Sequence, residues 1–144
     1  MTLLFKIVFL AGVLVVASKP FTEEERLAMF TELIGNCKAK EGASDNDVQE
    51  AIEHKPPTTQ QGRCFNACMM ENLGIMVNSK LSVEGSIKIA EMTGDATKVK
   101  NSEAVSLECQ SVGGGDRCDS VAEIMQCVEQ ACAKLGIDPA KDLH

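Results

Sequence analysis

The chain has 144 residues, 44% of them hydrophobic and 24% charged, and a formal net charge of −7. This length suits one domain, and the apolar content is high enough to form a core, which excludes an elaborate multidomain enzyme and a disordered chain. An acidic chain without a cluster of lysines and arginines repels phosphate, and we therefore expect no nucleic-acid partner.

The first 18 residues have the pattern of a secretory signal peptide. Lys6 precedes an apolar run at 7–17, and the small residues Ala17 and Ser18 supply a cleavage site. The run is shorter than the roughly 20 apolar residues that span a bilayer, although an uncleaved anchor is the alternative interpretation. We expect cleavage to leave residues 19–144 as a single secreted, extracellular domain without a membrane anchor.

The mature chain begins with two expected helices. Thr22 and Glu25 have capping-box spacing, and apolar residues recur after them on one side of a helix that Gly42 ends. The residues on that side are Leu27, Phe30, Leu33, Ile34 and Cys37. Ser44 is a suitable N-cap for a second, short helix. The apolar face of that helix carries Val48, Ala51 and Ile52.

A third helix is expected from about Gln61 to Val77. It is apolar around most of its circumference, which is typical of a helix at the centre of a domain. Cys64 and Cys68 are four residues apart, and they therefore share one face of this helix.

Three further helices complete the expected fold. Ser82 and Asp95 are placed to cap the fourth helix and the fifth, and the glycines at 113–115 break the fifth. The last helix covers about 118–135, with Gly136 as its stop. No segment shows the alternation of a strand, so we predict an all-α fold class with about six helices.

The seven cysteines of a secreted chain indicate a disulfide framework. Because seven is odd, at least one cysteine is unpaired or is bonded to another molecule. A metal site is not favoured, since the chain has only two histidines and no two cysteines separated by two residues. We expect neither a metal nor a cofactor.

Six of the cysteines have a spacing that resembles that of the insect odorant-binding proteins, the pheromone-binding and general odorant-binding superfamily. In order, they are Cys37-x26-Cys64-x3-Cys68-x40-Cys109-x8-Cys118-x8-Cys127. The resemblance covers the whole mature chain and implies a compact helical bundle around a hydrophobic cavity. It also implies three interlocked disulfides, whereas the spacing alone leaves the pairing open. The implied pairs are Cys37 with Cys68, Cys64 with Cys118, and Cys109 with Cys127.

Cys132 departs from the six-cysteine pattern. On the last helix it lies in the middle of the apolar stripe that contains Val121, Met125 and Val128. We expect a buried thiol that behaves as a small hydrophobic side chain, and an intermolecular disulfide is the alternative.

The resemblance implies a carrier of small hydrophobic molecules (odorants, pheromones or fatty lipids) through aqueous extracellular fluid. Methionine side chains can form the adaptable walls of a ligand cavity, and the scarcity of aromatic residues favours aliphatic ligands. The alternative for each methionine is that it is an ordinary core residue. The candidate ligand-binding residues are Phe65, Met69, Leu73, Met76, Ile87, Val105, Val121, Met125 and Val128, and Phe30, Leu33 and Ile52 are further candidates.

The alternatives to an olfactory carrier differ in strength. An enzyme is not expected, because His54 lacks the serine or reactive cysteine of a catalytic constellation. A lipid or pheromone carrier of the same fold in haemolymph, gut or reproductive fluid is the stronger alternative. The expected partner is a small hydrophobic ligand, with a sensory-neuron receptor as a further candidate, and the expected oligomeric state is a monomer or weak homodimer.

Acid-triggered ligand release is a further hypothesis, because some members of the family release ligand on acidification. His54 and the tail at 137–144 are the candidates for such a switch. In the tail, Ile137 and Leu143 are able to cover an opening.

Overall fold

The computed structural model describes residues 19–143; the expected signal peptide at 1–18 and His144 lie outside the described residues. Within that range the chain forms seven helices and a two-stranded hairpin. In chain order the elements are α1 (Glu23–Glu41), α2 (Asp45–Ile52), α3 (Gln60–Asn72), β1 (Met76–Val77), β2 (Lys80–Leu81), α4 (Val83–Glu91), α5 (Ala96–Cys109), α6 (Arg117–Leu135) and α7 (Pro139–Asp142).

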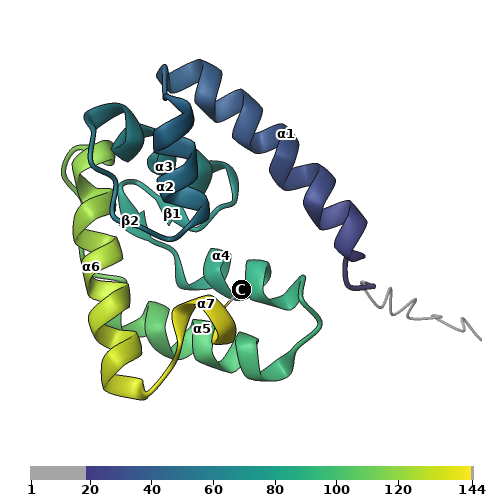
Figure 1. Cartoon of the computed structure of the whole chain (residues 1–144). Coiled ribbons are helices and arrows are strands. Elements are labelled where there is room, and N and C mark those ends of the chain that lie inside the picture. The colour runs from purple at the N-terminus through teal and green to yellow at the C-terminus, as the bar shows by residue number, and fades with distance from the viewer. Residues whose placement is uncertain (1–18, 144) are drawn as a thin grey trace, which may run out of the picture.

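Helix α3 lies at the junction of the domain, where it packs against α1, α2 and α6. Helix α4 packs against α5, which in turn packs against α6 and contacts α7. In Figure 1, α1 leaves this assembly diagonally, so that its N-terminal half extends away from α2 and α3. The all-α class is confirmed, and the short α7 adds one helix to the six that were predicted.

The predicted helix ends are set by local capping. Thr22 and Ser44 each form a capping box, the first with Glu25 and the second with Asp47. At the other ends of α1 and α6, Gly42 and Gly136 adopt left-handed conformations with φ of 64° and 69°. A residue without a Cβ adopts this conformation at little cost, which explains why both helices stop there.

The third helix is shorter than the sequence predicts. It ends at Asn72 instead of Val77, because the chain turns at Gly74 (φ 72°) and then forms the hairpin of β1 and β2. Asn78 and Ser79 both have positive φ, as a two-residue hairpin turn requires. The prediction that the chain has no strand was therefore wrong, because strands of two residues are too short to produce a visible alternation.

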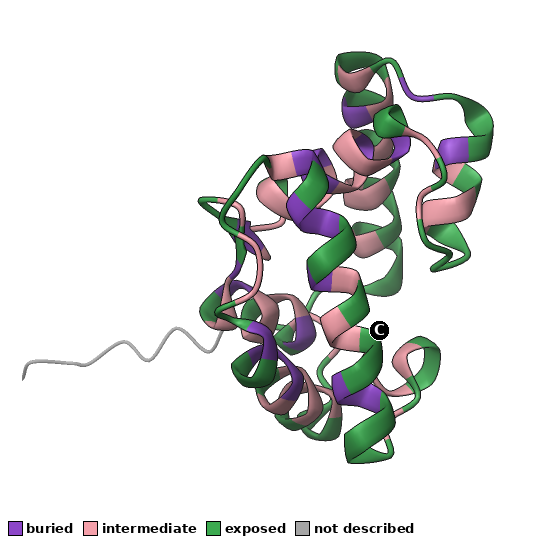
Figure 2. Ribbon diagram, turned by 90° about the vertical axis from the view of Figure 1, so that its left-hand side faces the viewer, coloured by how far each residue is buried: buried purple, intermediate pink, exposed green. Residues whose placement is uncertain are grey.

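The buried apolar side chains form two separate clusters. The larger lies among α3, the hairpin, α5 and α6 and consists of Ala67, Met76, Leu81, Val105, Cys109, Val121, Ile124, Ala131 and Cys132. The smaller joins α1, α3 and the α1–α2 turn through Cys37, Ala43, Phe65 and Cys68. Figure 2 shows these buried positions as stretches along the inner sides of the helices. The buried apolar interior thus consists of two clusters that both include residues of α3.

Three disulfides connect the helices, in the pairing that the resemblance implies. Cys37–Cys68 joins α1 to α3, Cys64–Cys118 joins α3 to α6, and Cys109–Cys127 joins α5 to α6. The remaining thiol, Cys132, is unpaired and buried in the larger cluster, as predicted. Burial raises the pKa of the Cys132 thiol, which keeps it in its neutral form.

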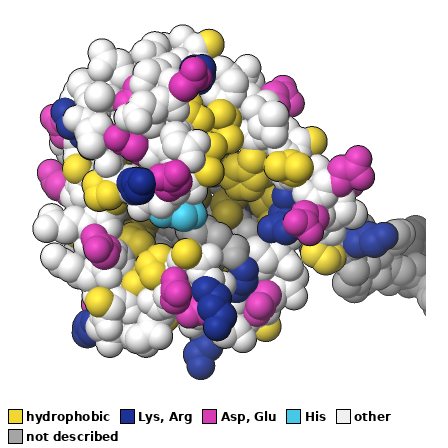
Figure 3. Space-filling view, viewed as in Figure 1, with side chains coloured by type: hydrophobic (Ala, Val, Ile, Leu, Met, Phe, Trp, Pro, Cys, Tyr) yellow, Lys and Arg dark blue, Asp and Glu magenta, His cyan; other side chains and the backbone are white. Residues whose placement is uncertain are grey.

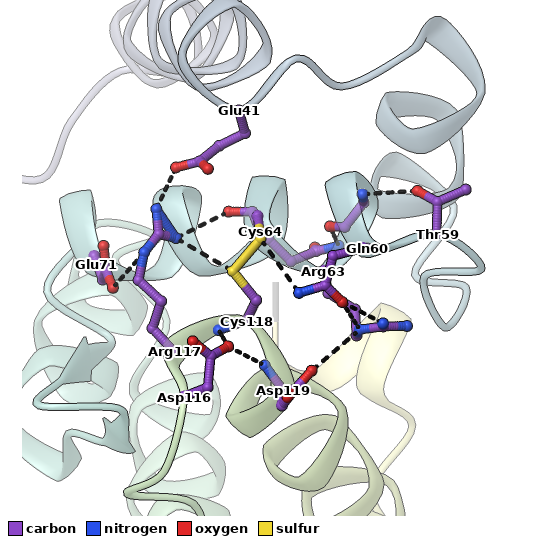
Figure 4. The surroundings of a disulfide bond; sticks show 12 residues. Glu41, Thr59, Gln60, Arg63, Cys64, Glu71, Asp116, Arg117, Cys118 and Asp119 are labelled. Atoms are coloured by element: carbon purple, nitrogen blue, oxygen red, sulfur yellow. Dashed lines mark hydrogen bonds and ion pairs between the residues drawn. A yellow bond between two sulfur atoms is a disulfide. The ribbon is translucent and has the colours of Figure 1, made fainter.

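Charged side chains surround the Cys64–Cys118 disulfide (Figure 4). The Arg117 guanidinium pairs with Glu41 at the end of α1, and its Nε lies 3.9 Å from a carboxylate oxygen of Glu71 in α3. Its Nη1 also donates to the carbonyl oxygen of Cys64 at 3.4 Å. Arg117 therefore links the three helices that meet at this disulfide.

A buried carboxylate connects the starts of α2 and α3. Asp47 is only 3% exposed, and it accepts hydrogen bonds from the hydroxyl of Thr59, the N-cap of α3, and from Ser44. The bond from Thr59, followed by those from Ser44, holds the pKa of Asp47 below its usual value. Because the folded-state pKa is lowered, this stabilisation is complete above the unfolded pKa of about 3.9 and is lost as pH falls through the folded pKa.

Replacing Asp47 by asparagine is therefore expected to lower the free energy of unfolding at pH 7 by about 2 kcal/mol, because charged hydrogen bonds are lost in a buried place. In guanidinium unfolding, the difference between Asp47→Asn and the wild type should shrink as pH falls from 5 to 2. Asp45→Asn, on the exposed side of the same turn, should change stability little. A difference that stays constant over this pH range would contradict the role given to the Asp47 carboxylate.

Candidate ligand-binding site

A pocket of about 80 Å³ lies between the N-terminal half of α1, the end of α4 and the C-terminal segment. Its lining consists of Arg26, Phe30, Ile89, Met92, Thr93 and Leu143. On this face of the molecule, Figure 3 shows hydrophobic side chains gathered in a hollow beneath α1, with basic side chains at its edge. The pocket is therefore largely apolar and is formed by segments that are far apart in the sequence.

The local structure explains how these side chains meet. Arg26 and Phe30 are four residues apart on α1 and share one face. The last turn of α4 and the turn after it supply Ile89, Met92 and Thr93. The Thr93 hydroxyl donates to the carbonyl oxygen of Ala90 at 2.7 Å, so its hydrogen atom is already used within the turn.

The C-terminal segment forms the third side of the pocket. Asp138 caps α7 by accepting a hydrogen bond from the backbone of Ala140. The Asn101 side chain of α5 donates to the carbonyl oxygen of Asp142 at 3.4 Å. These contacts help to place Leu143 beside α1 and α4 in the pocket lining, and a covering role for the tail stays a prediction.

Among the described residues of this lining, Arg26 is the one that carries a charge. Its Nε is buried from solvent and has no hydrogen-bond partner among the described residues. The site thus offers apolar contacts from several side chains together with one half-buried arginine, whose Nε is fully buried.

None of the nine predicted ligand-binding residues is among those that line this pocket. Four of them are buried within the two clusters: Phe65, Met76, Val105 and Val121. The other five are half-buried: Met69, Leu73, Ile87, Met125 and Val128. Leu73 and Ile87 belong to neither cluster, so they lie outside the two packed regions. Direct contact of these nine residues with a ligand remains a prediction.

The further candidates Phe30, Leu33 and Ile52 lie in different surroundings. Phe30 lines the pocket, and Leu33 packs at the edge of the smaller cluster. Leu27 and Ile52 were predicted on apolar faces, but they are 67% and 56% exposed. For Leu27 the reason is that this half of α1 extends beyond α3, and Ile52 is at the far end of a short helix.

The sequence analysis did not name Arg26, Ile89, Met92 or Thr93 as ligand-binding candidates. Arg26 could have been found, because its spacing from Phe30 places the two residues on one face of a predicted helix. Ile89 and Thr93 carry no such signal, since only the packing of α4 opposite α1 brings them to the pocket. His54, which was considered for a pH switch, is exposed in a left-handed conformation (φ 55°) after α2, and that role stays a hypothesis.

Residues 19–143 contain no helix that is long and apolar enough to cross a bilayer. Over the same range, His, Cys, Asp and Glu side chains nowhere gather in a group of three that could hold a metal ion. The features described are those of a small helical binding protein, cross-linked by three disulfides, with an apolar pocket under its first helix.

The family assignment follows from comparison with known sequences. The model of the PBP/GOBP family matches residues 19–131, and the chain belongs to this family. General odorant-binding protein 28a of Drosophila melanogaster is 34% identical to the chain over 139 residues, which are 94% of this chain and 95% of the relative. General odorant-binding protein 19d of the same fly is 30% identical, with 92% of each chain covered.

Solved structures agree with this assignment. The odorant-binding protein dmelOBP28a from Drosophila melanogaster superimposes with a TM-score of 0.64 and 29% identity, over 81% of this chain and 100% of that structure. The fatty acid binding protein OBP56a from the oral disk of the blowfly Phormia regina has a TM-score of 0.62 and 20% identity, over 81% and 98%. The second likeness, at its lower identity, is a likeness of fold.

Proposed function

We propose that this protein is a secreted carrier, which binds small hydrophobic molecules such as odorants, pheromones or fatty lipids and transports them through aqueous extracellular fluid. The observation that carries the proposal is the apolar pocket between α1, α4 and the C-terminal segment in a chain of the PBP/GOBP family. The named relatives are odorant-binding proteins, and one structural neighbour is a fatty acid binding protein. Binding and release, without catalysis, is the activity that this site supports.

Secretion is supported by two observations. The family match begins at residue 19, where the mature chain is expected to start after removal of residues 1–18. Three disulfides are typical of proteins that fold in an oxidising compartment. We therefore propose residues 19–144 as the working domain. The cells that secrete it determine whether its cargo serves smell or lipid transport in another fluid.

The size of the pocket implies that the domain opens to take a ligand. Sites for small molecules usually have about 300–1,000 Å³, well above the volume of about 80 Å³ found here. The N-terminal half of α1 extends away from α2 and α3, and the four-residue α7 contacts α5. We propose that these two segments move apart and extend the pocket toward Leu73 and Ile87, which belong to neither hydrophobic cluster.

A fluorescent hydrophobic probe tests this function on refolded, fully oxidised protein of residues 19–144. We expect the probe to bind at micromolar concentration and to be displaced by some of three ligand classes: short odorants, long-chain alcohols or acids, and sterols. The class that displaces the probe identifies the natural type of cargo. A folded protein that binds no probe would contradict the carrier function and favour a role for the protein's surface.

Phe30→Ala is expected to weaken probe binding at least about tenfold, because the ring is a large apolar part of the pocket lining. Leu27→Ala is the matched control, since it removes an exposed side chain one turn earlier on the same helix. It should leave the affinity unchanged. Equal affinities for the two variants, measured by probe titration, would place the binding site elsewhere.

A further inference from the structure

Arg26 differs from the other arginines of the chain in having no anionic partner among the residues that the structure describes. The sequence contains three arginines. Arg63 hydrogen-bonds with Gln60 and lies 3.6 Å from a carboxylate oxygen of Asp119, and Arg117 pairs with Glu41 (Figure 4). Arg26 forms no ion pair with any described residue, although its Nε is buried.

The Nε of Arg26 is buried without a hydrogen-bond partner among the described residues, although the residue as a whole is only half-buried. Arginine stays charged at every physiological pH, so it cannot relieve burial by losing its proton. Buried polar atoms are nearly always hydrogen-bonded in folded proteins, and an exception requires an explanation. Here the buried Nε belongs to a residue that lines a pocket otherwise made chiefly of Phe30, Ile89, Met92 and Leu143. The missing partner is therefore expected inside the pocket.

We infer that Arg26 binds the carboxylate of an amphiphilic ligand, whose alkyl chain lies against the apolar lining. This inference rests on the proposed carrier function and names its ligand class: single-chain carboxylic acids of the fatty-acid type. A guanidinium presents parallel N–H donors that match the two oxygens of a carboxylate. An alcohol or ester of the same length would fill the apolar part of the pocket and leave the Arg26 donors unpaired.

Because of the overall charge, a preference for acids over alcohols depends on the contact between Arg26 and the carboxylate. With a net charge of −7, the chain repels an anionic ligand at long range, so the field of the whole protein does not favour an acid over an alcohol. A preference for the acid must therefore come from a local contact. Of the described residues that line the pocket, Arg26 is the one that provides a positive charge.

The test compares dodecanoic acid, dodecan-1-ol and methyl dodecanoate as competitors of a fluorescent probe on residues 19–144 at pH 8. Wild-type protein should bind the acid about tenfold or more tightly than the alcohol. In Arg26→Met that preference should disappear through weaker binding of the acid, while the affinity for the alcohol is kept. Arg26→Lys retains the charge without the paired donors, and it should recover part of the preference.

Lys40→Gln is the matched control, because it removes one positive charge from the exposed, opposite end of α1. It should leave the preference for the acid unchanged. Acid and alcohol binding equally to the wild type, or a preference that survives in Arg26→Met, would overturn the inference and leave the carrier function intact. Failure of the probe and all three competitors to bind folded protein would instead overturn the proposed function together with this inference.

Discussion

Replacing Cys64 and Cys118 together by serine is expected to lower the free energy of unfolding by about 4 kcal/mol. This disulfide closes the longest of the three loops, with a sequence separation of 54, and so removes the most freedom from the unfolded chain. It joins α3, the helix at the junction of the domain, to the start of α6. Small domains have total stabilities of about 5–15 kcal/mol, so this loss would leave the fold marginal.

The matched comparison is the double replacement of Cys109 and Cys127. Their sequence separation of 18 gives an expected loss of about 3 kcal/mol, smaller than that for Cys64 and Cys118. Both cysteines of each pair are replaced, so that neither variant gains a free thiol in addition to Cys132. Urea unfolding of the oxidised variants measures both losses. A larger loss from the shorter loop would show that native-state contacts, and not loop closure, decide the contribution of each disulfide.

Gly85→Ala is expected to cost about 2–3 kcal/mol, the typical cost of forcing an extra carbon into a packed interior. Gly85 is buried near the start of α4, where the helix passes the turn after α3. An added Cβ would overlap the carbonyl oxygen of Gly74 and lie 2.5 Å from its carbonyl carbon. Because these are backbone atoms, no change of side-chain rotamer relieves the overlap, and α4 must move.

The same substitution should weaken ligand binding, because α4 carries Ile89 to the pocket. Gly35→Ala is the matched control: a Cβ in the middle of α1 meets no atom within 4 Å. Alanine is the better helix former, so Gly35→Ala should stabilise the protein by about 0.5–1 kcal/mol. Thermal unfolding and probe titration of both variants test the contrast. Similar stability changes in the two variants would show that α4 does not approach the turn as closely as described.

The elements that the sequence predicts well are those set by neighbours along the chain. Thr22, Ser44 and Gly136 mark helix ends because their capping partners lie within a few residues. The sequence analysis did not predict the hairpin of β1 and β2, because its strands have only two residues each. Asn78 and Ser79, both with positive φ, were the available signal for its turn. The disulfide pairing was implied by family resemblance, since spacing alone does not distinguish between pairings.

The sequence predicted that the site is a hydrophobic ligand-binding site, but it predicted only part of the position of that site in the fold. Helical periodicity identifies side chains that point inward, and Phe65, Val105 and Val121 are indeed buried. It does not reveal which inward side chains face a neighbour and which face unfilled space. Leu27 illustrates the limit, because its place on the apolar face of α1 is correct and yet α1 extends beyond the helices that would cover it.

The sequence by itself determined the helical class, the capped helix ends and, through the spacing of six cysteines, the family. These features depend on local hydrogen bonding, on helical periodicity and on a recognisable order of residues. Only the tertiary structure decided where the pocket lies, because its walls come from α1, α4 and the segment after α7. It also decided that Arg26 has no partner among the described residues while Arg63 and Arg117 are paired. The physical reason is that empty space and unpaired charge are properties of the packed whole, which no segment possesses alone.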